Sequence, residues 1–282
     1  MPLKHILGLD HVVINVRDLD RAAHDWKMLG FTVSPRGVHS AHLGSGNYTI
    51  VFEHDYLELL GVLAETEHLK PTIAFLKERE GIERAAFTTD DAQAGADEVR
   101  ARGLTPLGPV HFGRPVDLPD EGRSEAKFNV FRWPLIETPG GLRIFACQHL
   151  TRENVWVPEL QRHANGATRI VRLEILAANT KAAAEHLSRL IDEPVTRIPE
   201  GFRVPSGGNR ADFLFYAPAS FAALYPQAVR AGATREGAAA IVLATRDLEA
   251  ARTYSRALPV GAGRACVPAE AANGVILTFV EE

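Results

Sequence analysis

Two short segments near the start of the chain carry side chains that could bind a metal ion. The segment DHVVINV places His11 near the beginning of an apolar, β-branched run, and the segment YLELLGV places Glu58 between leucines. Because side chains alternate along a strand, the leucines beside Glu58 would face a core while Glu58 faces the other way. A carboxylate among apolar residues is costly unless it is paired, hydrogen bonded or bound to a metal ion. Imidazole nitrogen and carboxylate oxygen both bind divalent metals, and a carboxylate can also act as a general base.

Each of these two residues also has an ordinary structural interpretation. A single histidine in a strand is usually a core residue hydrogen bonded to the backbone, and an inward glutamate is often paired with an arginine. The presence of both His11 and Glu58 in one repeated unit, described below, favours the metal-site interpretation.

The later segment LRIFACQHL adds two candidate ligands. Alternation would place Phe145, Cys147 and His149 on one face of a strand. Cysteine and histidine both bind metal ions, and a thiolate ligand would favour zinc. We expect Cys147 to be a core residue and His149 to be the better ligand candidate.

Other polar residues could contact a small molecule. Asn47 follows two glycines that would permit close backbone approach, although a plain loop is the alternative interpretation. Arg114, Arg132 and Trp133 stand out in the segment before LRIFACQHL. An inward Arg132 would bind a carboxylate or phosphate with two parallel hydrogen bonds, and an outward one would be solvated. We take Asn47, Arg132 and Trp133 as the substrate-binding candidates.

The composition limits the class of protein. The 282 residues are 46% hydrophobic and 23% charged, with a formal net charge of −4. These values are typical of a globular protein and argue against nucleic-acid and anionic-membrane partners. We find no run of about 18 apolar residues that would span a membrane. The N-terminal segment has no secretion signal, and two cysteines give no disulfide framework, so we expect a cytoplasmic protein.

A strand, an Asp or Asn that can cap a helix, a helix and a second strand recur along the chain. The four copies are LDHVVINVRDLDRAAHDWKMLGFTV, IERAAFTTDDAQAGADEVRARGLTP, RIVRLEILAANTKAAAEHLSRLIDEPV and AAIVLATRDLEAARTYSRALPVGAG. In the first copy we expect strands at 31–35, 47–53 and 56–62 after the helix, which gives the order βαβββ.

The chain is therefore expected to be an α+β protein of four βαβββ modules. Pairing two modules would close their sheets around a shared hollow, as a half-open barrel of mixed sheet. The polar stretch 149–168 separates the pairs, so we predict one domain over 1–150 and a second over 151–282.

The position seven residues before the capping residue differs among the copies. When Asp18 is aligned with Asp90, Glu83 corresponds to His11 and becomes a candidate ligand or catalytic base. A surface glutamate at the entrance of a strand is the alternative. The same count places Arg172 in the third copy and an alanine in the fourth, and neither can hold a divalent cation. The second pair is thus expected to be a copy without metal ligands.

These motifs resemble the vicinal oxygen chelate superfamily, which includes glyoxalase I, extradiol dioxygenases and bleomycin-resistance proteins. The segments YLELLGV, FACQHLTRENVW and RHANGA resemble the branch of glyoxalase-like proteins, and this resemblance covers about residues 7–166. It implies paired βαβββ modules whose first and fourth strands carry ligands to one divalent metal. Two neighbouring oxygens of the substrate then chelate that metal.

The resemblance implies specific roles. His11, Glu58 and His149 would bind the metal, which would be manganese, iron, zinc or nickel, and Glu58 or Glu83 would move protons. The superfamily usually has a glutamate on the fourth strand of the second module, and LRIFACQHL has none. The ligand set and the metal therefore remain open.

Two functions fit this sequence. One is a metal-dependent isomerase, lyase or dioxygenase acting on a small molecule, in a chain that could form a homodimer. The other is a metal-free protein that binds or sequesters a small molecule in the same hollow.

Overall fold

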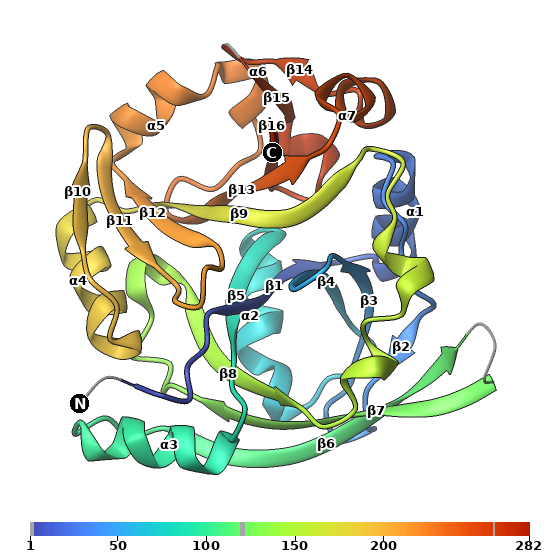
Figure 1. Ribbon diagram of the computed structural model, residues 1–282, viewed down its shortest axis with the longest axis vertical. Helices are drawn as coiled ribbons and strands as arrows, with labels where there is room; N and C mark the ends of the chain where they lie inside the picture. The colour runs from blue at the N-terminus through green and yellow to red at the C-terminus, as the bar shows by residue number, and fades with distance from the viewer. Residues whose placement is uncertain (1–2, 119–121, 262) are drawn as a thin grey trace.

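The computed structural model describes residues 3–118, 122–261 and 263–282 and consists of two eight-stranded sheets (Figure 1). The first sheet and its helices are formed by β1 (Leu9–Val16), α1 (Leu19–Met28), β2 (Gly37–Val38), β3 (Ser45–Val51), β4 (Tyr56–Val62), α2 (Lys70–Glu78), β5 (Gly81–Thr88), α3 (Ala92–Ala101), β6 (Leu107–Leu118), β7 (Gly122–Arg132) and β8 (Arg143–His149). A single-turn helix, η1 (Glu67–Leu69), leads into α2.

The second half of the chain repeats this order. It contains β9 (Ala167–Leu176), α4 (Thr180–Ile191), β10 (Thr196–Ile198), β11 (Gly201–Pro205), β12 (Asp212–Tyr216), α5 (Pro218–Leu224), α6 (Gln227–Arg230), β13 (Gly237–Thr245), α7 (Leu248–Ser255), β14 (Leu258–Pro259), β15 (Arg264–Val267) and β16 (Ile276–Glu281). Between the halves lie the short helices η3 (Arg152–Asn154) and η4 (Pro158–Gln161), and η2 (Pro139–Gly141) and η5 (Ala269–Ala271) precede β8 and β16.

The strand order confirms the expected α+β class and the pairing of βαβββ modules. The first sheet has the order β2-β3-β4-β1-β5-β8-β7-β6, and the second has the corresponding order β10-β11-β12-β9-β13-β16-β15-β14. Within a module the first and fourth strands are parallel, as β1 is to β4. Two modules join where their first strands pair antiparallel, as β1 does with β5.

Helix caps define how the four modules correspond. The side chains of Asp18, Asp91, Asn179 and Asp247 accept hydrogen bonds from backbone N–H groups in the first turns of α1, α3, α4 and α7. The alignment on Asp90 was therefore wrong by one residue. Seven residues before Asp91 stands Arg84, so Arg84 and not Glu83 corresponds to His11. Either of two adjacent aspartates could cap α3, and the sequence did not distinguish them.

One expected strand is also displaced. Residues 31–35 form no regular strand, and the short second strand of the first module is β2 at Gly37–Val38. The proline at position 35 has no N–H to donate to a sheet, so the regular ladder with β3 begins after it, although the N–H of Ser34 already donates to the carbonyl of Thr49.

The two faces of the first sheet have different surroundings. Val12 and Ile14 of β1 and Leu57 and Leu59 of β4 belong to a core that includes residues of both halves of the chain. The opposite face, which carries His11 and Glu58, lines a cavity. The alternation expected from the sequence is thus confirmed for both strands.

The corresponding face of the second sheet is covered. One apolar cluster covers it with Phe221 of α5, Tyr225 directly after α5 and Val229 of α6. These residues pack against residues of β9, β12, β13 and β16. The hydroxyl of Tyr225 donates to Oε2 of Glu174 at 2.7 Å, and Nε of Arg172 donates to Oε1 of the same carboxylate at 2.8 Å. The position that corresponds to His11 therefore holds a partly buried arginine that is paired with a buried glutamate.

Among the described residues, no helix is long and apolar enough to cross a membrane.

Candidate functional site

The cavity on the first sheet has a volume of about 240 Å³. Strands β1, β4, β5 and β8 contribute charged and polar residues together with apolar ones such as Phe145, and β6 and β7 contribute an apolar patch of Val110, Phe112, Phe128 and Val130. His68 and Leu69, from the single-turn helix before α2, also line it. The cavity therefore offers both apolar and charged surface to a small molecule.

His11 is held by the residue that precedes it. Its Nδ1 lies 2.6 Å from Oδ1 of Asp10, and both side chains are buried. Asp10 also accepts from Nε2 of His149 at 2.9 Å and from the Thr88 hydroxyl at 2.9 Å. Burial by itself would raise the pKa of Asp10, but the two histidines lower it well below its usual value. Asp10 is thus a buried carboxylate that fixes two imidazole rings.

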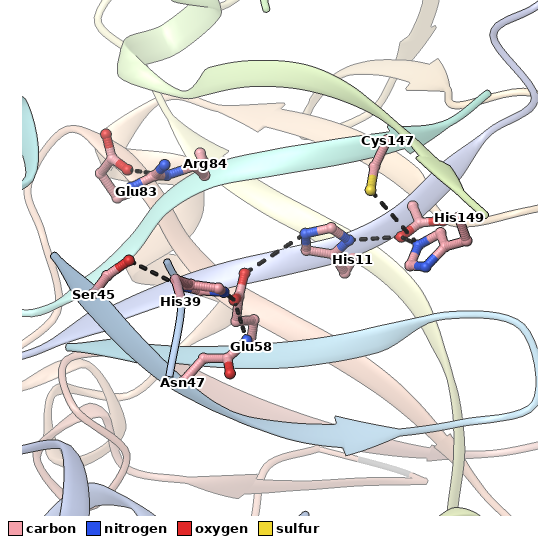
Figure 2. Close-up of polar contacts among 10 residues, drawn as sticks. His11, His39, Ser45, Asn47, Glu58, Glu83, Arg84, Cys147 and His149 are labelled. Atoms are coloured by element: carbon pink, nitrogen blue, oxygen red, sulfur yellow. Dashed lines mark hydrogen bonds and ion pairs between the residues drawn. The ribbon is translucent and has the colours of Figure 1, made fainter. Parts of the chain in front are cut away.

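Glu58 lies on the side of His11 opposite His149, as Figure 2 shows. Its Oε1 accepts a hydrogen bond from Nδ2 of Asn47 at 2.6 Å, and its Oε2 lies 3.7 Å from Nε2 of His11. Burial opposes the charge of Glu58, but the attraction of His11 and His39 in their protonated forms and the hydrogen bond from Asn47 lower the pKa of this carboxyl overall. Glu58 is therefore a buried anion at neutral pH.

The contact between His11 and Glu58 has a chemical consequence. Asp10 can only accept, so Nδ1 of His11 carries the proton, and a neutral ring then presents the lone pair of Nε2 to Glu58. Two acceptors that face each other at 3.7 Å repel one another, and a cation shared by them removes this repulsion. That cation is either a proton on His11 or a metal ion bound by both residues. Nitrogen and oxygen donors fit a divalent transition metal.

His39, a residue that the sequence analysis did not select, also points at Glu58. Its Nε2 lies 4.0 Å from Oε1 of Glu58, and its Nδ1 lies 2.8 Å from the hydroxyl of Ser45 (Figure 2). Burial lowers the pKa of His39 to about 4, although Glu58 raises it. His39 is therefore neutral at pH 7 and could act as a further ligand. Because it follows a two-residue strand in a polar segment, no periodic pattern marked it.

The structure places His149 apart from Glu58. In Figure 2 His11 lies between them, and Nε2 of His149 is engaged by Asp10. Its Nδ1 is buried and has no hydrogen-bond partner within the described chain. Asp10, Cys147 and His149 bring one ligand atom each within 4.8 Å of one another. Burial raises the pKa of the Cys147 thiol well above its usual value, which opposes formation of the thiolate that binds metals.

Glu83 is engaged by two arginines. Its Oε2 accepts from Nε of Arg84 at 2.5 Å, and its Oε1 accepts from Nη1 of Arg143 at 2.6 Å. Burial alone would raise the pKa of Glu83, but the two arginines outweigh burial, so the pKa of this carboxyl lies below its usual value. Figure 2 shows Glu83 and Arg84 away from His11 and Glu58.

The three substrate-binding candidates all line the cavity. Asn47 orients Glu58, and Arg132 is half-buried with Nη1 3.3 Å from Nδ1 of His68. Trp133 is buried against Phe131, and its indole N–H has no partner in the part of the chain that the structure describes. Adjacent residues of a regular strand would point to opposite faces. Both reach the cavity because β7 ends at Arg132.

Comparison with known proteins agrees with this architecture. A family model described as a glyoxalase-like domain matches residues 9–191, which is more than half of the chain. The chain therefore belongs to the glyoxalase-like domain family, and the resemblance to the vicinal oxygen chelate superfamily is confirmed. No curated protein matches it.

Two solved structures share the fold over nearly the whole chain. A hypothetical protein from Staphylococcus aureus has a TM-score of 0.72 and 13% identity, covering 98% of this chain and 100% of that chain. A mutant of 4-hydroxymandelate synthase from Streptomyces coelicolor has a TM-score of 0.59 and 12% identity, covering 98% of this chain and 92% of that chain. At these identities the likeness concerns the fold alone.

Proposed function

We propose that this protein is a metal-dependent enzyme of the glyoxalase-like family that acts on a small molecule in the cavity of the first sheet. The observation that carries the proposal is the contact between Nε2 of His11 and Oε2 of Glu58, two acceptors 3.7 Å apart at the wall of that cavity. The reaction class, whether isomerase, lyase or dioxygenase, stays open.

His11 and Glu58 are the proposed metal ligands. Asp10 would hold His11 in the tautomer that presents Nε2, and Asn47 would orient the carboxylate of Glu58. A bound divalent metal would supply Lewis acidity to two neighbouring oxygens of a substrate. Glu58 is also the proposed proton acceptor, because both oxygens of Glu83 are engaged by arginines.

The third ligand has two candidates. His149 is the residue that the sequence predicts, and it would have to leave Asp10 to reach Glu58. His39 is favoured by its contact with Glu58 and its neutral ring.

A metal-free binding protein is the second candidate function. In that case the cation between His11 and Glu58 is a proton, and the two residues form an ion pair with each other or with a ligand. The same cavity would then bind a small molecule without chemistry.

Metal titration separates these proposals. The protein is stripped with EDTA and titrated by calorimetry with Mn²⁺, Ni²⁺ and Zn²⁺. We expect about one ion per chain, and at least tenfold weaker binding by His11→Gln and Glu58→Gln. His39→Gln and His149→Gln identify the third ligand. Exposed His54→Gln is the control and should bind as the wild type does.

Two results would overturn the metal site. Absence of binding to folded wild-type protein would leave the metal-free function. Binding that is lost in Cys147→Ala and His149→Gln but kept in His11→Gln and Glu58→Gln would move the ion to the cluster of Asp10, Cys147 and His149.

We further propose that a domain boundary lies between residues 150 and 151 and that the protein forms a homodimer. We also propose a cytoplasmic location without nucleic-acid or membrane partners. The core that includes residues of both sheets supports two halves that fold together rather than independently.

A further inference from the structure

Arg114 is a buried cation that the proposed metal site does not use. It lies in β6, opposite Ala126 of β7, and is 6% exposed. It makes no hydrogen bond or ion pair with any residue that the structure describes, yet it lines the cavity. A guanidinium has five N–H donors, and a residue that is so little exposed offers them little water beyond the cavity itself. The arrangement therefore indicates a partner that is not part of the chain.

The other arginines of the cavity differ from Arg114. Arg84 donates to Glu83 and to the hydroxyl of Thr72, and Arg143 donates to the same glutamate. Arg132 contacts His68. Of the four arginines that line the cavity, Arg114 is thus the one that makes no hydrogen bond with any residue of the described chain, while each of the others makes at least one.

The neighbouring backbone leaves room for the Arg114 side chain. A Cβ atom on Gly37 would lie 2.8 Å from Nη1 of Arg114 and 2.3 Å from Oδ1 of Asn47. Glycine at this position in β2 therefore lets both side chains approach the cavity. Oδ1 of Asn47 is buried and likewise has no hydrogen-bond partner among the described residues.

Positive charge predominates in the lining. Glu58 is the one carboxylate among the described lining residues, which include four arginines. Glu83 does not line the cavity, but it pairs with two of these arginines, Arg84 and Arg143. The wall formed by Phe112, Phe128 and Val130 is apolar. A ligand that fits both features is an anion with an apolar body.

We propose that the cavity binds a small organic anion and that Arg114 binds its carboxylate or phosphate group, while the apolar wall contacts its hydrocarbon body. This inference rests on the proposed small-molecule function of the cavity and does not require the metal. Arg114 is then the residue that selects the ligand class.

The test uses the full-length protein in EDTA, so that its result is independent of metal binding. Calorimetry or ligand-detected NMR measures the affinity for phenylacetate, for the neutral phenylacetamide and for benzylphosphonate. We expect at least one of the two anions to bind at least tenfold more tightly than the amide. The comparison of the two anions distinguishes a carboxylate ligand from a phosphate ligand.

Variants then assign the effect to Arg114. We expect Arg114→Met to weaken anion binding at least tenfold and leave amide binding unchanged, and Arg114→Lys to retain part of the affinity. Arg36→Met is the control, since Arg36 is paired with Asp20 at the surface beside Gly37. Gly37→Ala keeps Arg114 but displaces it, so it should weaken anion binding in a protein with unchanged circular dichroism.

Three results would overturn the proposal. The first is equal affinity of the protein for the anions and for the amide. The second is an anion affinity of Arg114→Met within threefold of that of the wild type. The third is an equal loss of anion affinity in Arg36→Met and in Arg114→Met. A failure of Mn²⁺ binding, in contrast, would overturn the metal site and leave this inference standing if the anion still depends on Arg114.

Discussion

Asp10 and His11, adjacent in β1, are joined side chain to side chain by a hydrogen bond of 2.6 Å between Oδ1 and Nδ1. Adjacent strand residues normally point to opposite faces, but the register of β1 against β5 shifts between Leu9 and His11. This irregularity lets a fully buried carboxylate support the imidazole that faces the cavity. It also places His149 on the same carboxylate.

We predict that Asp10→Asn weakens metal binding about 10- to 100-fold, because a neutral amide neither fixes the tautomer of His11 nor raises the basicity of Nε2. Calorimetric titration with Mn²⁺ measures the effect. Thr88→Val removes the third contact to Asp10 without changing its charge and should cost less than threefold. Wild-type affinity in folded Asp10→Asn would show that the His11 tautomer does not limit metal binding.

Asp55 predicts an unusual pH dependence of stability. Its Oδ1 accepts from the backbone N–H of Ile170 in β9, and it is 2% exposed. Burial raises the pKa of Asp55 to about 7, and the N–H of Ile170 and the charge of Arg210 oppose this only in part. In the unfolded chain this carboxyl has a pKa of about 4.

The sign of the effect follows from proton binding. Between pH 4 and pH 7 the folded protein holds a proton on Asp55 that the unfolded chain has lost, so this group stabilises the fold at low pH and that contribution is lost as the pH rises to about 7. Asp55→Asn stays neutral and keeps an acceptor for Ile170. The melting temperature of Asp55→Asn minus that of the wild type should therefore be about 5 °C larger at pH 8 than at pH 5.

Thermal melting at both values checks this prediction. Glu53→Gln, two residues away and exposed, is the matched control. Its melting temperature should differ from that of the wild type by the same amount at pH 5 and at pH 8. An equal difference at pH 5 and pH 8 for Asp55→Asn would contradict a raised pKa.

Glu83→Gln distinguishes a structural from a catalytic glutamate. Loss of the charge leaves Arg84 and Arg143, which are mostly buried, without their anion, so we expect destabilisation of about 1–3 kcal/mol. Metal affinity should stay within about threefold of the wild type, because the pairs with the arginines turn Glu83 away from the proposed ligands. Denaturant unfolding and calorimetry measure the two effects.

The opposite pattern would restore the role predicted from the sequence. If Glu83→Gln keeps its stability and loses metal binding, Glu83 is a ligand. Glu67→Gln removes an exposed pair with Lys70 and should change neither quantity.

Tyr225→Phe tests the covered hollow of the second sheet. The Tyr225 hydroxyl donates to the buried carboxylate of Glu174, so its removal should cost about 1–3 kcal/mol of stability. Binding of metal and of anions should be unchanged, because this contact belongs to the other half of the chain. A change in either affinity with intact folding would show that the two halves are coupled.

The periodic features of the chain were sufficient to predict its architecture. Alternation in DHVVINV and YLELLGV, together with recurrent capping residues and glycines, predicted the modules, their order and the faces of β1 and β4. These are local properties, because period and cap chemistry act over a few neighbouring residues. The same repeats showed that the second pair lacks a histidine at the position of His11, and the structure places the partly buried Arg172–Glu174 pair there.

The tertiary structure alone decided which polar groups meet. Asp10 reaches His11 and His149 through an irregular register, His39 reaches Glu58 from a segment without a pattern, and Glu83 is claimed by Arg143 of β8. Arg114 was visible in the sequence, but its lack of a partner is a property of the folded cavity. Contacts between distant segments depend on register and bulges, which one residue more or less in a strand can change.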